Sequence, residues 1–276
     1  MGSNYYDGKL AILTGASEGI GKSLALELLR HGARVVICSR SADKLRAAVS
    51  ELHSTGQDAS RSVAYRAFDL VEYDETERNI GSIVEEFGRP HFLMNCAGFA
   101  HPGYVEDLQP AHFRRMMEVN YLGTVHACKA TLPHLQDGQS HILNISSVAG
   151  FVGLFGNAGY CATKYAVIGF SEALRSEVFH RGIRVSVLCP PNTRTPGLDR
   201  ENRMKPAEVL VTEEKVSVME PEAVARATLK ALPKGRPLIL PSFECRAAHR
   251  LSRFLPGILR RLTTRPRVEA RKDISP

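Results

Sequence analysis

Paired cysteines, long apolar runs and low-complexity segments are all missing from this sequence, and each absence argues against a class of protein. The six cysteines are scattered, without a C-x-x-C pair and without clustered histidines. This spacing argues against a disulfide framework and against a zinc site, and it is typical of a reducing compartment. No uninterrupted apolar run has membrane-spanning length, and the first residues lack a signal-peptide core. We therefore expect a cytoplasmic protein without a metal.

The excess of positive charge lies almost wholly at the C-terminal end. Residues 241–276 contain nine Lys or Arg and three acidic residues, which gives this stretch +6 of the chain's formal +7. The remaining 240 residues are therefore close to neutral, which argues against a nucleic-acid-binding body.

The order of apolar segments predicts an α/β fold. Short, continuously apolar runs alternate with segments of helical periodicity, which is typical of a doubly wound parallel sheet with helices on both faces, the Rossmann fold. The strands are expected at 9–14, 34–38, 63–68, 91–94, 141–145, 183–189 and 237–240, with helices between them. We predict one domain over residues 1–240 and a basic amphipathic extension over 241–276.

A glycine-rich turn follows the first predicted strand. Gly15, Gly19 and Gly21, with Ser17 and Ile20 between them, would allow a tight turn and a close approach of the backbone to a pyrophosphate. The following helix would offer free N–H groups and its positive dipole end to the phosphates. We interpret this strand–turn–helix unit as a dinucleotide site.

The end of the second strand bears on the choice of dinucleotide. A carboxylate there would bind a ribose 2′-hydroxyl, but the sequence has Ser39 and Arg40, which suit a 2′-phosphate. We therefore predict NADPH/NADP+ as the cofactor. The alternative is that Arg40 is a solvated residue at a strand end.

Tyr160 and Lys164 lie one helical turn apart, and Ser147 lies thirteen residues before Tyr160. A nearby positive charge favours a phenolate and lowers its pKa from about 10, so that the phenol could exchange protons with a carbonyl or an alcohol. The spacing alone is weak evidence, because a tyrosine and a lysine share a helix face in many proteins. Its weight comes from the glycine-rich turn.

Taken in order, the glycine turn, Asn95-Cys-Ala-Gly98, Asn120, Ser147 and Tyr160-x-x-x-Lys164 resemble the short-chain dehydrogenase/reductase family over residues 9 to about 240. The resemblance implies four catalytic roles. Tyr160 is the acid/base, Lys164 lowers its pKa and binds the nicotinamide ribose, Ser147 binds the substrate oxygen, and Asn120 holds a water that leads to solvent. Ser146 is a rival hydroxyl, and the thirteen-residue spacing favours Ser147.

The same resemblance implies further cofactor contacts. They comprise the adenine contact Asp69-Leu70, the cofactor floor Asn95, Ala97 and Gly98, and Pro190 and Thr193 after the sixth strand. Glu18 departs from the pattern, since some NADPH-using members carry a basic residue at its position. Arg40 would then work without that partner.

The segment at about 190–218, which we expect to cover the substrate, is more specific than the catalytic residues. Pro190-Pro191 replaces the commoner Pro-Gly turn, and Glu201-Asn-Arg-x-Lys-Pro206 follows it. These motifs resemble the branch of the family that reduces the keto group of long-chain sphingoid bases. The implied reaction is reduction of a lipid-like ketone to a secondary alcohol with NADPH. The alternatives are another apolar carbonyl (a retinoid, a steroid or an acyl chain) and a non-catalytic NADP(H)-binding protein at a membrane.

The last segment has helical spacing of apolar residues from Leu251 to Leu262, with arginines interleaved and a break expected at Pro256-Gly257. Such a helix could lie on an anionic membrane surface, or it could pack on the body of the protein. The family resemblance also implies a homodimer or homotetramer through the helices that begin near Pro110 and Asn157.

Overall fold

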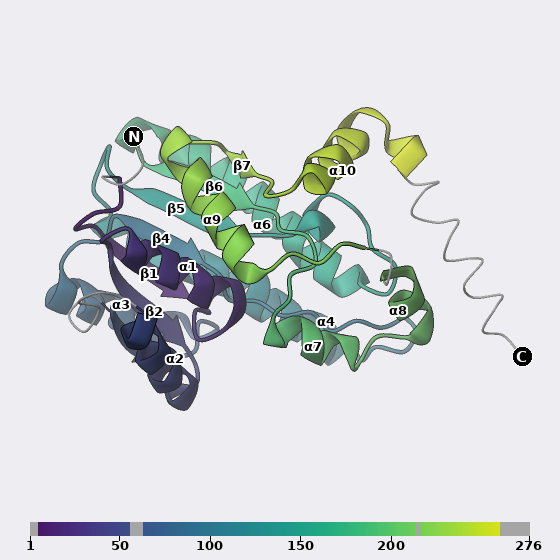
Figure 1. The fold of residues 1–276 in the computed structure, drawn as a ribbon, viewed down its shortest axis with the longest axis horizontal. Coiled ribbons are helices and arrows are strands. Elements are labelled where there is room, and N and C mark those ends of the chain that lie inside the picture. Colours follow the sequence, from purple (N-terminus) through teal and green to yellow (C-terminus); the bar gives the residue numbers. More distant parts are fainter. Residues whose placement is uncertain (1–4, 56–62, 214–215, 260–276) are drawn as a thin grey trace, which may run out of the picture.

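The computed structural model describes residues 5–55, 63–213 and 216–259. Seven parallel strands form one sheet in the order β3-β2-β1-β4-β5-β6-β7, and helices lie on both of its faces (Figure 1). All seven predicted strands are present, namely β1 (Leu10–Thr14), β2 (Arg34–Ser39), β3 (Val63–Ala67), β4 (Phe92–Asn95), β5 (His141–Ile145), β6 (Arg184–Leu188) and β7 (Leu238–Ile239). The predicted doubly wound fold is confirmed. The domain boundary at residue 240 stays a prediction.

Two hydrophobic cores cover the two faces of the sheet, because successive side chains of a buried strand point to opposite sides. Ala11 and Leu13 of β1 join one core, while Leu10 and Ile12 join the other. The first core contains α1 (Gly19–Arg30), α2 (Ala42–Thr55) and α9 (Pro221–Ala231). The second contains α3 (Tyr73–Phe87), α5 (Gly123–Thr131) and α6 (Ala158–Glu177).

The register of the strands brings their carboxyl ends to one edge. Thr14 pairs with Cys38 of β2 and with Asn95 of β4, and Asn95 pairs in turn with Asn144 of β5. The segments that follow β1, β4, β5 and β6 therefore start side by side. In an open α/β sheet this edge, where the strand order reverses, is where ligands bind.

The helix predicted from Pro110 to Leu135 is interrupted. It consists of α4 (Pro110–Met117), a π-helical segment (Glu118–Leu122), α5 and a short 3₁₀ turn (Leu132–His134). The wider turn at Glu118–Leu122 contains Asn120, whose side chain is fully buried. A π segment inside a helix is frequent at functional sites.

The segment after β6 has more structure than the sequence indicated. It holds α7 (Pro196–Asn202) and α8 (Ala207–Glu213), and Thr195 caps α7 by accepting a hydrogen bond from Leu198 N at 3.2 Å. Both helices are too short to show a clear apolar period, and the sequence therefore did not indicate them. Figure 1 shows them at the end of the molecule away from α2.

The C-terminal helix also differs from its prediction. α10 spans Phe243–Phe254 and therefore begins earlier than the predicted helical spacing at Leu251. It ends at Phe254, Leu255 is not helical, and a new helical turn starts at Pro256, so the predicted break is confirmed one residue before Pro256. Leu262 and most of the basic tail lie outside the described residues. Within the described ranges, no helix is both long and apolar enough to cross a bilayer.

Candidate active site

A cavity of about 810 Å³ opens at the carboxyl edge of the sheet. It is bounded by the turns after β1, β2, β4 and β5, by the start of α6, and by α7. Sixteen of the predicted site residues line it, namely Gly15, Ser17, Gly19, Ile20, Gly21, Ser39, Arg40, Asp69, Leu70, Ala97, Gly98, Ser147, Tyr160, Lys164, Pro190 and Thr193. Residues that are up to 178 positions apart in the chain, Gly15 and Thr193, thus share one space.

Asn95, predicted as part of the cofactor floor, does not line this cavity. Its side chain lies within the sheet, where the amide donates to Asn144 Oδ1 at 2.8 Å and its oxygen accepts from the Thr14 hydroxyl at 3.4 Å. These contacts join β1, β4 and β5 beneath the site. The predicted cofactor contact of Asn95 stays a prediction, and its side chain holds the strands beneath the site.

Asn120 lies behind the cavity wall and joins the wall to α6. Its amide oxygen accepts from Phe99 N at 2.9 Å, and its amide nitrogen donates to Phe99 O at 2.9 Å and to Thr163 Oγ1 at 3.0 Å. Both amide protons are therefore used to hold the segment after β4 against α6. The predicted water at Asn120 stays a prediction.

Lys164 is only 4% exposed, although it carries an ammonium group. Its Nζ donates to the backbone oxygen of Ile145 at 3.0 Å. A methyl group on Gly98 would lie 3.3 Å from this Nζ, so the absence of a side chain at Gly98 leaves room for the lysine. Burial lowers the pKa of Lys164 to about 8, while the charge of Glu201 acts in the opposite direction.

The Tyr160 hydroxyl faces the same space, beside Ser147. Burial raises the pKa of Tyr160 above its ordinary value, the charge of Glu201 raises it further, and a hydrogen bond with Ser147 opposes both effects. The net shift of this pKa is upward, opposite in direction to the lowering by Lys164 that the resemblance implies. Tyr160 is therefore a neutral phenol, able to donate a proton.

The two candidate hydroxyls are distinguished by their partners. Ser146 is 1% exposed and donates to the backbone oxygen of Lys164 at 2.8 Å. Ser147 is partly exposed, interacts with Tyr160, and caps the next turn by accepting from Ala149 N at 3.1 Å. Of the two hydroxyls, Ser147 is therefore the one that lines the cavity with a hydrogen bond to Tyr160, and its catalytic role stays a prediction.

The turn after β1 has the shape of a phosphate cradle. Gly15 has a φ of +63°, and a methyl group added to it would lie 2.9 Å from the backbone of Cys96. A methyl group on Gly21 would lie 2.7 Å from the Gly15 oxygen, so these positions require glycine. Glu18, the N-cap of α1, makes no side-chain capping bond, which leaves the first N–H groups of α1 available to an anion.

The predicted 2′-phosphate position contains an unusual hydroxyl. The oxygen of Ser39 is buried, and among the described residues nothing hydrogen-bonds to it. Arg40 is 63% exposed and lies 4.0 Å from the Asp69 carboxylate. A buried hydroxyl beside an unburied guanidinium fits a phosphate oxygen.

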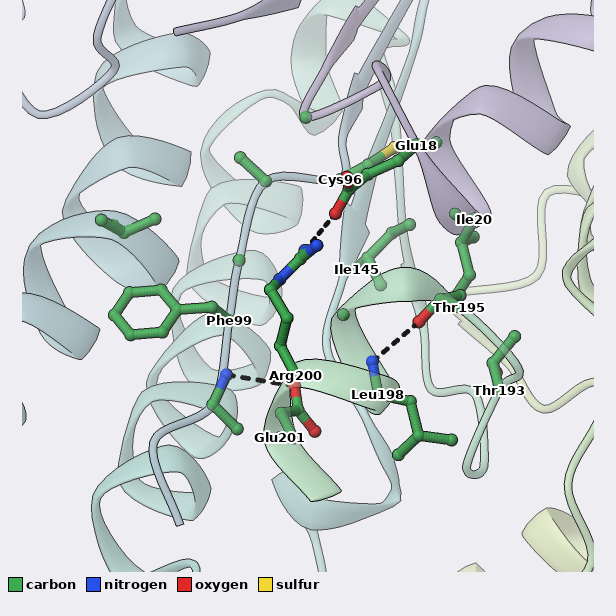
Figure 2. A pocket seen from close by; sticks show the side chains of 18 of the residues that line it. Glu18, Ile20, Cys96, Phe99, Ile145, Thr193, Thr195, Leu198, Arg200 and Glu201 are labelled. Carbon is green, nitrogen blue, oxygen red and sulfur yellow. Dashed lines mark hydrogen bonds and ion pairs between the residues drawn. The ribbon is translucent and has the colours of Figure 1, made fainter. Parts of the chain in front are cut away.

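Glu18 departs from the family pattern, and two cations that the sequence did not single out lie against it. Its carboxylate accepts from Lys44 at 3.0 Å and also pairs with Arg200 of α7 (Figure 2). Burial would raise the pKa of Glu18, but these two hydrogen bonds outweigh it and the pKa lies below its ordinary value. The sequence could have indicated Lys44 as a site residue, because it follows Arg40 by four residues and lies in the first turn of α2. Arg200 could not, because α7 was not predicted.

Comparison with known proteins decides the family. The sequence model of the short chain dehydrogenase family matches residues 9–206. The chain belongs to this family. It is 36% identical to 3-dehydrosphinganine reductase of Danio rerio over 83% of this chain and 70% of the relative. It is 36% identical to 3-ketodihydrosphingosine reductase of Bos taurus over 83% of this chain and 69% of that relative. It is 30% identical to a putative oxidoreductase, SadH, of Mycobacterium tuberculosis over 93% and 94%.

Solved structures of the same family share the fold. A short-chain dehydrogenase/reductase of Burkholderia phymatum, in complex with NAD, superposes with a TM-score of 0.78 at 25% identity over 90% of this chain and 93% of that one. ElxO with NADP bound superposes with a TM-score of 0.71 at 28% identity over 80% of this chain and 90% of that one. The protein described here is therefore an oxidoreductase with the short-chain dehydrogenase fold.

The glycine turn leads to a prediction about stability. Replacing Gly15 by Ala should lower the free energy of unfolding by roughly 3 kcal/mol or more, because a left-handed residue is strained and the new methyl group meets the Cys96–Ala97 backbone. Gly138→Ala is the matched control, since Gly138 has a φ of +71° and nothing within 4 Å of an added methyl group. This control should cost only about 1–2 kcal/mol. Urea denaturation measures both, and equal losses would contradict the close packing.

Proposed function

We propose that this protein reduces the ketone of a long-chain amino ketone to a secondary alcohol with NADPH, 3-ketodihydrosphingosine being the substrate. The single observation that carries the proposal is the convergence of Ser147, Tyr160 and Lys164 on one cavity with a neutral phenol. The names of the relatives from Danio rerio and Bos taurus support the choice of substrate. Apolar side chains of Leu154, Leu198 and Met204 on the cavity wall suit an alkyl chain.

The residues present fit a reduction in which a proton is given to the ketone oxygen. NADPH, when bound, supplies a hydride to the carbonyl carbon. A raised pKa keeps Tyr160 protonated at neutral pH, so its hydroxyl is the proton donor to the developing alkoxide. Ser147 donates a hydrogen bond to the same oxygen, and the Lys164 ammonium stabilises the phenolate that Tyr160 leaves behind.

A preference for NADPH over NADH is part of the proposal. The groups that would hold the 2′-phosphate are Ser39, Arg40 and Lys44, and all three line the cavity. Glu18 would repel a phosphate by itself, but its pairing with Lys44 and Arg200 offsets its charge. The glycine turn and the start of α1 would hold the pyrophosphate.

Tyr160→Phe should lower kcat about 10²- to 10⁴-fold, because it removes the proton donor while keeping the ring. NADPH binding, followed by fluorescence titration, should stay within a few-fold of the unmodified protein. Tyr165→Phe is the matched control on α6, since Tyr165 is 48% exposed and does not line the cavity. Substantial turnover by Tyr160→Phe would remove Tyr160 from the catalytic role.

Arg40→Glu should weaken NADPH binding by roughly 10- to 100-fold and leave NADH within a few-fold, because a carboxylate repels the 2′-phosphate and suits a free 2′-hydroxyl. Arg46→Glu makes the same charge change on an exposed face of α2, outside the cavity, and should alter neither affinity. Unchanged affinities for both cofactors in Arg40→Glu would rule out this role for Arg40.

The C-terminal helix supports a further proposal, contact with an anionic membrane surface. α10 packs on the body through Cys245, which is buried, and through His249 against the ring of Phe151. Beyond this contact, Phe254, Leu255 and Ile258 stay exposed, and exposed arginines accompany them on α10. Apolar and basic side chains together are what an interfacial helix requires. The cytoplasmic location and the homodimer or homotetramer stay predictions.

Replacing Phe254, Leu255 and Ile258 together by Ser should reduce sedimentation with vesicles that contain phosphatidylserine by about tenfold, since each removed side chain takes apolar area out of the interface. Vesicles of phosphatidylcholine alone should bind the unmodified protein weakly. Phe179→Ser is the control, because Phe179 is exposed at the far end of α6. Sedimentation that the triple change leaves intact would favour a helix that only packs on the body.

A further inference from the structure

We propose that Glu201 binds the protonated amino group of the substrate and so selects amino ketones over other apolar ketones. This inference rests on the proposed function and assigns the charge recognition within it. Glu201 lies on α7, lines the cavity, and its Oε1 accepts from Ala100 N at 3.3 Å. Figure 2 shows Glu201 on the side of Phe99.

The neighbouring residues Arg200 and Glu201 contact different segments of the cavity wall. Arg200 reaches Glu18 at the glycine turn (Figure 2), whereas Glu201 reaches the segment after β4. Glu201, Tyr160 and Lys164 line the same cavity, and the charge of Glu201 acts to raise the pKa of both Tyr160 and Lys164. A capped, short helix thus presents a cation toward the glycine turn and an anion toward the segment after β4.

The other two acidic residues of the cavity wall lie against cations of the protein. Glu18 pairs with Lys44 and Arg200, and Asp69 lies between Arg40 and Arg115 at 4.0 and 3.5 Å. Of the three acidic residues that line the cavity in the described chain, Glu201 is the one whose charge acts on Tyr160. Its position makes chemical sense if the substrate brings a positive charge.

The charge of Glu201 favours the ammonium of Lys164, but it is a disadvantage for Tyr160. It opposes formation of the Tyr160 phenolate, and it gives nothing to a neutral ketone. A substrate ammonium changes this balance, because Lys164 alone would repel it and Glu201 compensates that repulsion. In a 2-amino-3-ketone, standard bond lengths place the nitrogen about 2.5 Å from the carbonyl carbon. A group that holds the ammonium therefore also orients the carbonyl toward Tyr160 and Ser147.

The competing explanation is that Glu201 only anchors α7 through its bond to Ala100 N. Glu201→Gln separates the two, because the glutamine oxygen can still accept from Ala100 N while the charge is lost. Asp199→Asn is the matched control, since it removes one negative charge from an exposed position of the same helix, outside the cavity.

The test compares 3-ketodihydrosphingosine with the same ketone lacking the 2-amino group, both with NADPH. The unmodified protein should prefer the amino ketone. Glu201→Gln should lower kcat/KM for the amino ketone roughly 10- to 100-fold, mainly by raising KM. The kcat/KM for the deaminated ketone should change by less than about threefold. Asp199→Asn should behave as the unmodified protein with both substrates.

Three results would overturn the inference. An equal loss on both ketones would assign Glu201 the anchoring role, and an unchanged preference would remove it from the substrate. In both cases reduction of the amino ketone by the unmodified protein leaves the proposed function standing. Reduction of the deaminated ketone alone by the unmodified protein would overturn both. If Glu201→Gln unfolds, as its melting temperature would reveal, Glu201→Asp replaces it and should retain the preference because it keeps the charge.

Discussion

The burial of one ammonium group, that of Lys164, is the constraint on which the site depends. A charged amine at 4% exposure is costly unless its surroundings compensate it. The structure provides a backbone oxygen at Ile145, an empty position at Gly98 and the negative charge of Glu201. Each comes from a different element, so the sheet edge must be assembled before the lysine can be held. The register of β1, β4 and β5 provides that assembly.

The same surroundings determine the state of the catalytic phenol. A tyrosine near a lysine is expected to ionise easily, yet burial and Glu201 keep Tyr160 protonated. This state suits the reductive direction, in which a proton must be given. Charge in the cavity is therefore divided, with cations at the predicted phosphate positions and an anion that acts on the reacting groups. The short helix α7 connects the two regions through Arg200 and Glu201.

The fold and most of the site could be predicted from the sequence. Continuous apolar runs identified every strand, and local spacing identified the glycine turn and the relation of Ser147 to Tyr160. The direction of the Asn95 side chain could not be predicted; this side chain hydrogen-bonds within the sheet and does not line the cavity. The positions of Arg200 and Glu201 depend on tertiary packing, and α7 and α8 are too short to leave a periodic signal. The raised pKa of Tyr160 also escaped prediction, because desolvation depends on every element around the group.

Transfer of a labelled hydride tests the central claim most directly. The purified protein would be incubated with 3-ketodihydrosphingosine and NADPH that carries deuterium at the transferable position of nicotinamide C4, and the lipid product would be examined by mass spectrometry and NMR. The account predicts dihydrosphingosine with one deuterium on C3, formed in amounts equal to the NADPH consumed. Failure to form the alcohol, or an alcohol without deuterium at C3, would contradict it.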